Sequence, residues 1–301
     1  MRSVYFLLLI VMMLWGFNVS ALKVLVSAID PVMLTAVRIF TAGITVLIIT
    51  YFMGFFRLPR KNELFLIIYI GLFNVIAHHI FLALGLTRTS SVNAGLILGM
   101  GPLLTMMLSI LLLKDQVTRL RVTGFILGFL GVVMTTLGGA AGFSALSLGD
   151  VFVFISIFTQ AVSFILISKL NPSFDPRLLT GYMLTIGSFF IGLTSVVTES
   201  NFSQLTSLFT WKLGAVFLFS AVLCTAFGHM TYNFAIKQVG PVETAIFINL
   251  NTLFALIGAS IFLGEPIYKH HIIGFGLILA GIFIGSGALE YMLLKRKQRQ
   301  T

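Results

Sequence analysis

Ten apolar stretches of about twenty residues each constrain this chain more than any other feature. They lie near 4–22, 32–54, 63–83, 92–113, 121–138, 148–169, 178–198, 211–233, 242–263 and 271–291. A helix of about 20 residues crosses a hydrocarbon layer of about 30 Å. Helices are favoured because backbone polar groups must pair internally in lipid, whereas the strands of a membrane β-barrel alternate in polarity, a pattern absent here. We therefore expect an all-α integral membrane protein with ten transmembrane helices.

The composition excludes an ordinary soluble domain. Apolar residues make up 58% of the chain and charged residues 9%, against about half and about a quarter in globular proteins. A net charge of +10 can indicate a nucleic-acid partner. Most Lys and Arg residues, however, lie in the short loops between apolar stretches, so we expect a lipid bilayer and no nucleic acid as the surroundings of this protein.

The same loop cations predict the orientation in the membrane. With the N-terminus in the cytoplasm, most Lys and Arg residues fall in cytoplasmic loops, and only Lys23, Arg88, Lys212 and Lys269 fall in outside loops. Cytoplasmic loops of membrane proteins carry an excess of Lys and Arg. Both termini are therefore expected in the cytoplasm, and loops this short leave no room for a further soluble domain.

Two related halves are visible in the chain. The segment 85–131 returns 150 positions later at 235–281, where Asp115 pairs with Glu265, and His79 pairs with His229 upstream. A second match, offset by 145 positions, joins Asp30-Pro31 to Asp175-Pro176. The expected units are residues 3–138, residues 148–290 and a basic cytoplasmic tail, 291–301. Because each unit holds five spans, an odd number, the second enters the membrane inverted, as in many secondary transporters.

The centres of the fourth and ninth spans carry the strongest candidates for a binding site. The fourth reads Gly99-Met100-Gly101-Pro102, and the ninth carries Asn249 and Asn251 at the equivalent positions. Proline distorts the helical turn that precedes it, and interrupted helices at matching positions of two repeats indicate a transport site. The alternative is helix packing, because glycine, proline and asparagine are common where membrane helices meet.

Three further polar residues lie within spans. Trp15 and Asn18 share one face of the first helix, where they either line a cavity or pack. Arg38 lies about two turns into the second span, and a charge at that depth faces protein or water rather than lipid. It either meets a substrate carboxylate or serves structure and gating. Its counterpart in the second half is Met183.

Histidines at matching positions raise the question of proton coupling. His78 and His79 lie in the third span and His229 in the eighth. Histidine titrates near neutral pH and can relay protons inside a membrane, or it can remain neutral and hold helices together. Close to the inner end of these spans, Glu243 is expected to pair with Lys237.

Enzyme signals are missing from the sequence. It contains no HExxH metal motif, no Walker loop and no GxSxG nucleophile elbow. The nine acidic residues are scattered, so no cluster for a metal is apparent. We expect neither an enzyme nor a bound metal or cofactor.

Several motifs together resemble a known family. Leu14-Trp15-Gly16-Phe17-Asn18, Arg38-Ile39-Phe40, Leu111–Asp115 and Leu263-Gly264-Glu265-Pro266 are similar to segments of the EamA-like drug/metabolite transporters. The resemblance covers nearly the whole chain and departs from the usual pattern at Lys114, where glycine is common, and at Asp115, where glutamate is. It implies ten helices in two inverted halves and a carrier of small metabolites, often an exporter of amino acids, in a bacterial cytoplasmic membrane.

The sequence thus predicts a secondary active transporter that works by alternating access on a small-molecule substrate. A passive facilitator, an importer and a non-transporting sensor or assembly subunit remain as alternatives. The substrate, the coupling ion and the choice between monomer and homodimer stay open.

Overall fold

The structure is a computed structural model that describes residues 2–86, 88–89, 97–137, 147–171, 174–197, 202–264 and 267–285. Throughout these residues the regular structure is helical. The elements of the first half are α1 (Arg2–Val26), α2 (Pro31–Phe52), α3 (Lys61–Gly71), η1 (Leu72–Ala77), α4 (His78–Leu86), α6 (Gly101–Leu113) and α7 (Arg119–Leu137). Those of the second half are α8 (Leu148–Ser168), α9 (Pro176–Val197), η2 (Phe202–Phe209), α10 (Trp211–Leu218), η3 (Phe219–Phe227), α11 (Gly228–Val239), α12 (Pro241–Ala245), η4 (Ile246–Ile248), α13 (Asn249–Leu263) and α14 (Lys269–Gly285).

Seven helical stretches within this part of the chain are long and apolar enough to cross a membrane. They are Ser3–Val26, Pro31–Phe52, Lys61–Leu82, Leu148–Ser168, Pro176–Val197, Trp211–Val239 and Pro241–Phe262. Two shorter apolar helices, Ile97–Leu113 and Lys269–Gly285, accompany them. The protein is therefore an all-helical, multi-pass membrane protein.

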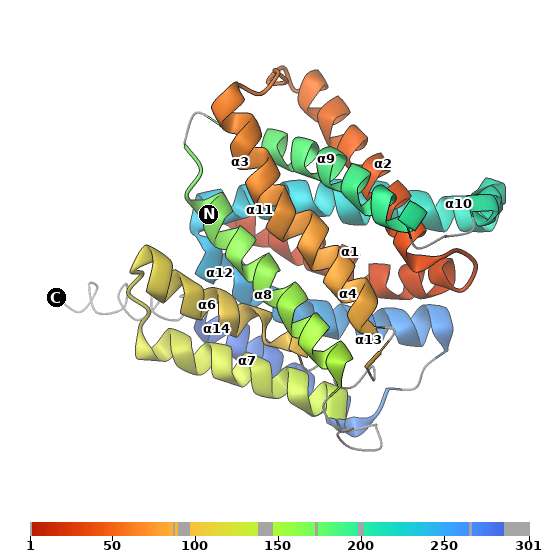
Figure 1. The fold of residues 1–301 in the computed structure, drawn as a ribbon. Helices are drawn as coiled ribbons and strands as arrows, with labels where there is room; N and C mark the ends of the chain where they lie inside the picture. Colours follow the sequence, from red (N-terminus) through yellow and green to blue (C-terminus); the bar gives the residue numbers. More distant parts are fainter. Residues whose placement is uncertain are drawn as a thin grey trace.

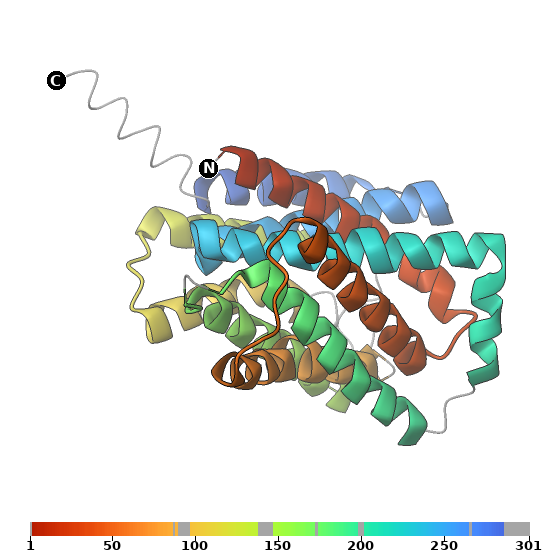
Figure 2. The same cartoon turned by 90° about the horizontal axis from the view of Figure 1, so that it is seen from above.

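Contacts between the two halves are arranged symmetrically. Helices α2 and α9 lie side by side at one edge of the bundle, and α7 and α14 lie side by side at the opposite edge (Figures 1 and 2). The contact of α1 with α13 is matched by that of α8 with α6, and the contact of α1 with η3 is matched by that of α8 with η1. Such exchange of partners is what a pseudo-twofold relation between the halves requires.

Glycines bring α7 and α14 into backbone contact. A Cβ built on Gly281 would lie 2.5 Å from the amide nitrogen of Gly128 and 2.6 Å from the carbonyl oxygen of Gly124. A Cβ on Gly124 would in turn lie 2.5 Å from the Cα of Gly285. The GxxxG pairs 124/128 and 281/285 thus face each other within one chain, as small residues at close helix crossings do.

Two helix starts agree with the sequence match that is offset by 145 positions. Asp30 caps α2, where its carboxylate accepts from the amides of Val32 at 3.1 Å and Met33 at 3.0 Å. Asp175 accepts from the amide of Arg177 at 2.8 Å at the start of α9. Burial raises the pKa of the Asp175 carboxyl, but hydrogen bonds from Arg177 outweigh that effect and leave the pKa below its usual value. Such side-chain caps satisfy the free amides of a first helical turn.

The sequence match that is offset by 150 positions is reflected in the C-terminal ends of α6 and α13. Lys114 has a φ of 58° and Gly264 a φ of 71°, so both helices end in a left-handed residue. This conformation is cheap for glycine and costly for a side chain. Lysine at position 114, where the resembling family commonly has glycine, was visible in the sequence, but its left-handed conformation was not predicted.

The third and eighth spans share an irregularity that the sequence did not indicate. In the third span the π-helical segment η1 precedes His79, and in the eighth span η3 precedes His229, the histidine at the matching position of the repeat. The two segments overlap when the chain is shifted by 150 positions. A π-helical turn adds a residue to the helix and is frequent at functional sites.

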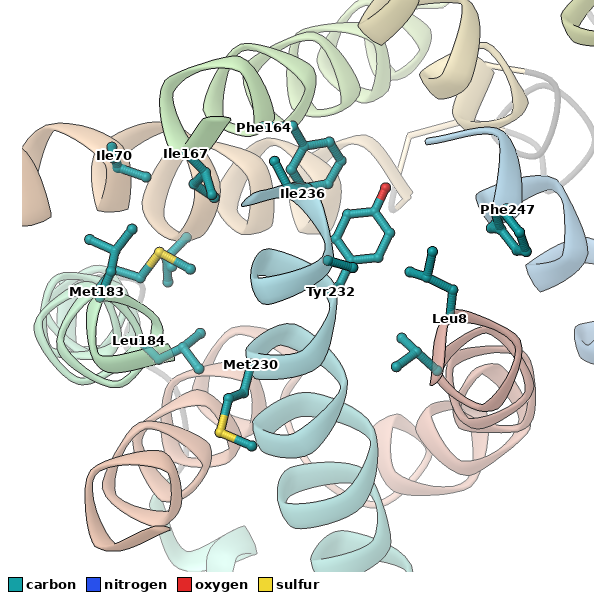
Figure 3. Close-up of a cluster of buried hydrophobic side chains, with 14 of the residues drawn as sticks. Leu8, Ile70, Phe164, Ile167, Met183, Leu184, Met230, Tyr232, Ile236 and Phe247 are labelled. Atoms are coloured by element: carbon teal, nitrogen blue, oxygen red, sulfur yellow. The ribbon is translucent and has the colours of Figure 1, made fainter. Parts of the chain in front are cut away.

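One end of the bundle, which we call the terminal end, is densely packed. It contains the start of α1 and the ends of α8 and α11. Its core includes Leu8, Phe164, Tyr232, Ile236 and Phe247, and Figure 3 shows Tyr232 at its centre. The ring of Tyr232 lies 5.0 Å from that of Phe164, and neither side chain is more than 2% exposed.

Cationic loops gather at this terminal end. Arg121 forms an ion pair with Glu243, which joins the start of α7 to the start of α12. The Nζ of Lys237 donates to the carbonyl oxygens of Ser168 and Leu170 at the end of α8. The expected pairing of Glu243 with Lys237 is therefore wrong: α11 and α12 turn the two side chains toward different neighbours, α8 and α7.

Candidate functional site

A cavity of about 420 Å³ lies between the two halves. Its lining comes from seven segments that are far apart in the sequence. The lining residues are Trp15, Asn18, Val19, Leu22, Arg38, His78, His79, Leu82, Leu98, Gly99, Ile157, Gln160, Cys224, Thr225, His229, Ile248, Asn249, Asn251, Thr252 and Ala255. Five of the seven residues predicted to line a substrate cavity, and all three histidines, therefore meet at one place.

The cavity occupies the half of the bundle away from the terminal end. Along α1 its lining runs from Trp15 to Leu22, in the second part of the helix, and along α4 it runs from His78 to Leu82. Its floor is the Trp15 ring, whose centroid lies 5.2 Å from that of Tyr232 in the core beneath. The packed terminal end thus separates the cavity from the cationic loops.

Trp15 joins the first helix to the π-helical segment of the eighth span. Its Nε1 donates to the backbone carbonyl of Cys224 at 2.8 Å, and its ring lies 5.0 Å from that of His229. A Cβ on Gly228 would lie 3.2 Å from Cδ1 of this ring and closer still to Nε1, so glycine makes room for the indole. The side chain therefore both packs and borders the cavity, the two roles that the sequence left open.

Arg38 is buried, with 6% of its surface exposed. Its Nη1 donates to Oγ1 of Thr225 at 2.6 Å, and its Nε has no hydrogen-bond partner. The Thr225 hydroxyl in turn donates to the carbonyl of Ser220 at 2.8 Å, within η3. The π-helical segment of the eighth span thus positions the guanidinium at the cavity wall.

The three histidines differ in how they are held. The Nδ1 of His78 lies 2.8 Å from Ser156 Oγ, and its Nε2 lies 3.1 Å from Gln160 Nε2, so both ring nitrogens are engaged. If the Gln160 amide donates to Nε2 of His78, that nitrogen is the acceptor, and the proton of the neutral ring is on Nδ1. His79 stacks edge-on against His78 at 4.7 Å, and its buried Nε2 has no partner. His79 therefore has a ring nitrogen that is free for a proton or a ligand.

Three asparagines lie on the cavity wall with incompletely paired amides. The Oδ1 atoms of Asn18 and Asn251 are buried without a hydrogen-bond partner, as is the Nδ2 of Asn249. Asn249 is 2% exposed, and Gly128 of α7 leaves the space for its side chain. Buried polar groups without partners are uncommon and costly. The Nδ2 of Asn249 lies against Gly128, so the oxygens of Asn18 and Asn251 are the atoms available to a molecule inside the cavity.

Gly101 and Pro102 do not line this cavity. Gly101 faces α8, where a Cβ would lie 3.0 Å from Cδ1 of Ile157, and Pro102 is buried in the first turn of α6. The helical run Ile97–Gly99 ends in a turn at Met100 before α6 begins. That break rotates Gly99 onto the cavity wall and turns the two predicted residues toward the protein. In the ninth span, the 3₁₀ segment η4 precedes Asn249 at the equivalent place.

Two polar residues on the wall were missed by the sequence analysis. Gln160 is the single strongly polar side chain in the middle of its span, and the 145-position register pairs it with Trp15, so a signal was present. Thr225 carried no such signal, because threonines recur in many spans and only the π-helical segment places this one beside Arg38.

Among the residues that the structure describes, no three His, Cys, Asp or Glu side chains approach closely enough to hold a metal ion. The cavity wall combines a single cation with neutral amides, imidazoles and aliphatic groups. Such a surface can bind a small polar molecule.

Comparison with known proteins places this geometry in context. A model of the EamA-like transporter family matches residues 2–137 and again residues 147–286. The chain is 28% identical to YyaM, an uncharacterized transporter of Bacillus subtilis (strain 168), over 99% of this chain and 98% of that protein. It is 22% identical to the chloroplastic WAT1-related protein At3g02690 of Arabidopsis thaliana, over 90% of this chain and 66% of that protein. A solved crystal structure shares the fold with a TM-score of 0.78 at 17% identity, covering 94% of this chain and 98% of the other.

Proposed function

Because this chain belongs to the EamA-like transporter family, we propose that it is a secondary active transporter of a small metabolite in a bacterial cytoplasmic membrane. The observation that carries the proposal is the cavity of about 420 Å³ between the halves. Its volume lies within the range of about 300–1,000 Å³ typical of small-molecule sites. Its wall is built from helices of both halves, where transporters with internal repeats bind their substrates.

The proposed architecture is ten spans in two inverted five-helix repeats, residues 3–138 and 148–290, with a basic tail at 291–301. The double match of the family model supports two repeats. The exchange of helix partners between the halves supports a twofold relation. The paired caps at Asp30 and Asp175 support the same boundaries.

We propose that the structure represents the state that is closed on the cytoplasmic side. The predicted orientation puts the terminal end in the cytoplasm, where the ion pair of Arg121 with Glu243 and the bonds of Lys237 to α8 hold the bundle together. In the alternate state these contacts and the core around Tyr232 separate, and the outer ends of α1 and α4 close over the substrate. This is the rocking of two repeats around one site.

Within the cavity, Trp15, Asn18, Arg38, Asn249 and Asn251 are the proposed substrate contacts. Gly101 and Pro102 shape the break in the fourth span that brings Gly99 to the wall. The histidines are the proposed route for a coupling proton, and the unpaired Nε2 of His79 on the cavity wall supports this role. The direction is proposed to be export, and the substrates amino acids or related compounds; the support for both is the family.

The test is a metabolite profile of medium and cytoplasm, with and without overexpression, in a host that lacks related exporters. Export predicts a compound that accumulates outside and falls inside. Asn251→Leu is expected to abolish the change, and Asn62→Leu, the same substitution at an exposed position of α3, is expected to preserve it. The two variants must insert into the membrane at equal levels.

Other outcomes discriminate between the alternatives. Accumulation inside would make the protein an importer. Flux that persists when an ionophore collapses the ion gradients would make it a passive facilitator. An unchanged profile from protein that is inserted in the membrane would refute transport of the measured compounds and favour a sensor or assembly subunit.

A further inference from the structure

Arg38 is a buried cation that lacks a counter-ion within the described part of the chain. Arg57, Arg121 and Arg177 each form an ion pair at a helix end, with Glu63, Glu243 and Asp175 respectively. The side chain of Arg38 is 6% exposed, and no Asp or Glu is among the residues that surround it on the cavity wall. Buried charges in proteins are normally paired, so the missing partner is a feature that needs a cause.

The guanidinium is also short of hydrogen bonds. It has five N–H donors, yet one bond, from Nη1 to Thr225, is formed, and the Nε–H has no partner. A planar fork of donors fits a carboxylate in a bidentate manner. Thr225 cannot compete for that anion, because its hydroxyl proton is directed to the carbonyl of Ser220. Thr225 therefore positions the cation and leaves its remaining donors for another molecule.

The number of cations on the wall indicates how much negative charge a bound molecule can carry. Met183, the counterpart of Arg38 in the second half, is apolar and fully buried, so the repeat supplies no second cation. Among the described residues on the wall, Arg38 is the single Lys or Arg. One guanidinium balances one negative charge, which favours a monocarboxylate over a doubly charged phosphate or dicarboxylate.

The neutral part of the wall accommodates the remainder of such a molecule. Aliphatic side chains, among them Leu22, Leu82 and Leu98, line it. The unpaired amide oxygens of Asn18 and Asn251 offer acceptors for N–H groups. The wall therefore combines a place for one carboxylate, acceptors for an amino or amide group, and an apolar surface.

We propose that Arg38, positioned by Thr225, is the subsite that binds the single carboxylate of the transported molecule. The inference rests on the proposed transport function and adds the chemical class of the substrate to it. It assigns Arg38 to substrate binding rather than to structure or gating, the alternative that the sequence left open.

The first test compares export profiles of cells that produce wild-type protein, Arg38→Gln, Arg38→Lys or Arg57→Gln at equal membrane levels. Arg57 lies outside the cavity and pairs with Glu63, so Arg57→Gln is the matched control. The exported compounds are expected to carry one carboxylate. Flux in Arg38→Gln is expected to fall about 10- to 100-fold, the equivalent of one charged hydrogen-bonding interaction. Arg38→Lys retains the charge and is expected to keep part of the flux.

The second test needs no variant, so it holds even if Arg38→Gln fails to fold. Wild-type protein in proteoliposomes takes up the exported acid in labelled form, and the unlabelled acid and its carboxamide are compared as competitors. The carboxamide is expected to compete at least about tenfold more weakly. Equal competition would overturn the carboxylate subsite.

The outcomes separate this inference from the proposed function. Export of compounds without an anionic group, or undiminished flux in Arg38→Gln, would overturn the subsite and leave transport standing. Absence of flux from inserted wild-type protein would overturn transport, and the subsite with it. Equal loss of flux for the acid and for its carboxamide in Arg38→Lys would assign Arg38 a structural role and overturn the inference.

Discussion

The glycine crossing of α7 and α14 leads to a quantitative prediction about stability. In Gly281→Ala, the new Cβ would lie 2.5 Å from the amide nitrogen of Gly128, 2.6 Å from the carbonyl oxygen of Gly124 and 2.8 Å from the Cα of Gly128. All three atoms belong to the backbone, so no side chain can rotate away and the helices must separate. Overpacking costs about 1–3 kcal/mol, and backbone contacts favour the upper end. Alanine regains about 1 kcal/mol of helix propensity, which leaves a net loss of about 2 kcal/mol.

The control lies on the same helix. A Cβ at Gly276 would have no atom within 4 Å, so Gly276→Ala is expected to be neutral or to stabilise by up to about 1 kcal/mol. Unfolding of the purified protein in detergent can be followed with a thiol-reactive dye, because Cys224 is the one cysteine and is buried. Gly281→Ala should lower the unfolding midpoint by several degrees relative to Gly276→Ala. Equal midpoints would refute the close crossing.

Three further predictions concern the termination of α6, the cavity and the histidines. Lys114→Gly relieves the left-handed conformation at that residue and should stabilise the protein by about 1 kcal/mol in the same thermal assay, whereas Lys114→Ala, which keeps the strain, should not. Asn251→Leu should reduce flux to background with normal membrane insertion, because it replaces the unpaired amide on the wall; unchanged flux would remove Asn251 from the site. His79→Phe combined with His229→Phe should flatten the dependence of flux on pH in proteoliposomes, and an unaltered profile would remove both rings from the proton path.

The helices and the relation between the two halves could be predicted from the sequence, because both depend on patterns spread over many residues. Twenty-residue apolar stretches specify helices in lipid, and the repeat registers located the caps at Asp30 and Asp175. The same registers brought His79 and His229 to one cavity. These features survive errors of one or two residues in any boundary.

The direction in which an individual side chain faces around its helix could not be predicted from the sequence. The π-helical segments η1 and η3 each insert a residue and change which side chains face inward, and no residue type marks them. The break at Met100 likewise turns Gly99, rather than Gly101, to the wall. The partner of Glu243 was mistaken for a similar reason, since Arg121 is adjacent only in three dimensions.

The helical framework of the protein is repeated in its two halves, whereas the residues on the cavity wall differ between matching positions. Within the described residues, helix crossings, left-handed helix ends and π-helical segments occur twice. The wall residues are unequal: Arg38 corresponds to Met183, and Gly99 corresponds to Asn249. In the proposed transporter, a substrate would meet one cation, which the first half supplies, and would therefore bind in a single orientation. It follows that substitutions at these unequal positions should alter which molecules are carried, whereas substitutions in the repeated frame should alter the rate of carriage for all of them.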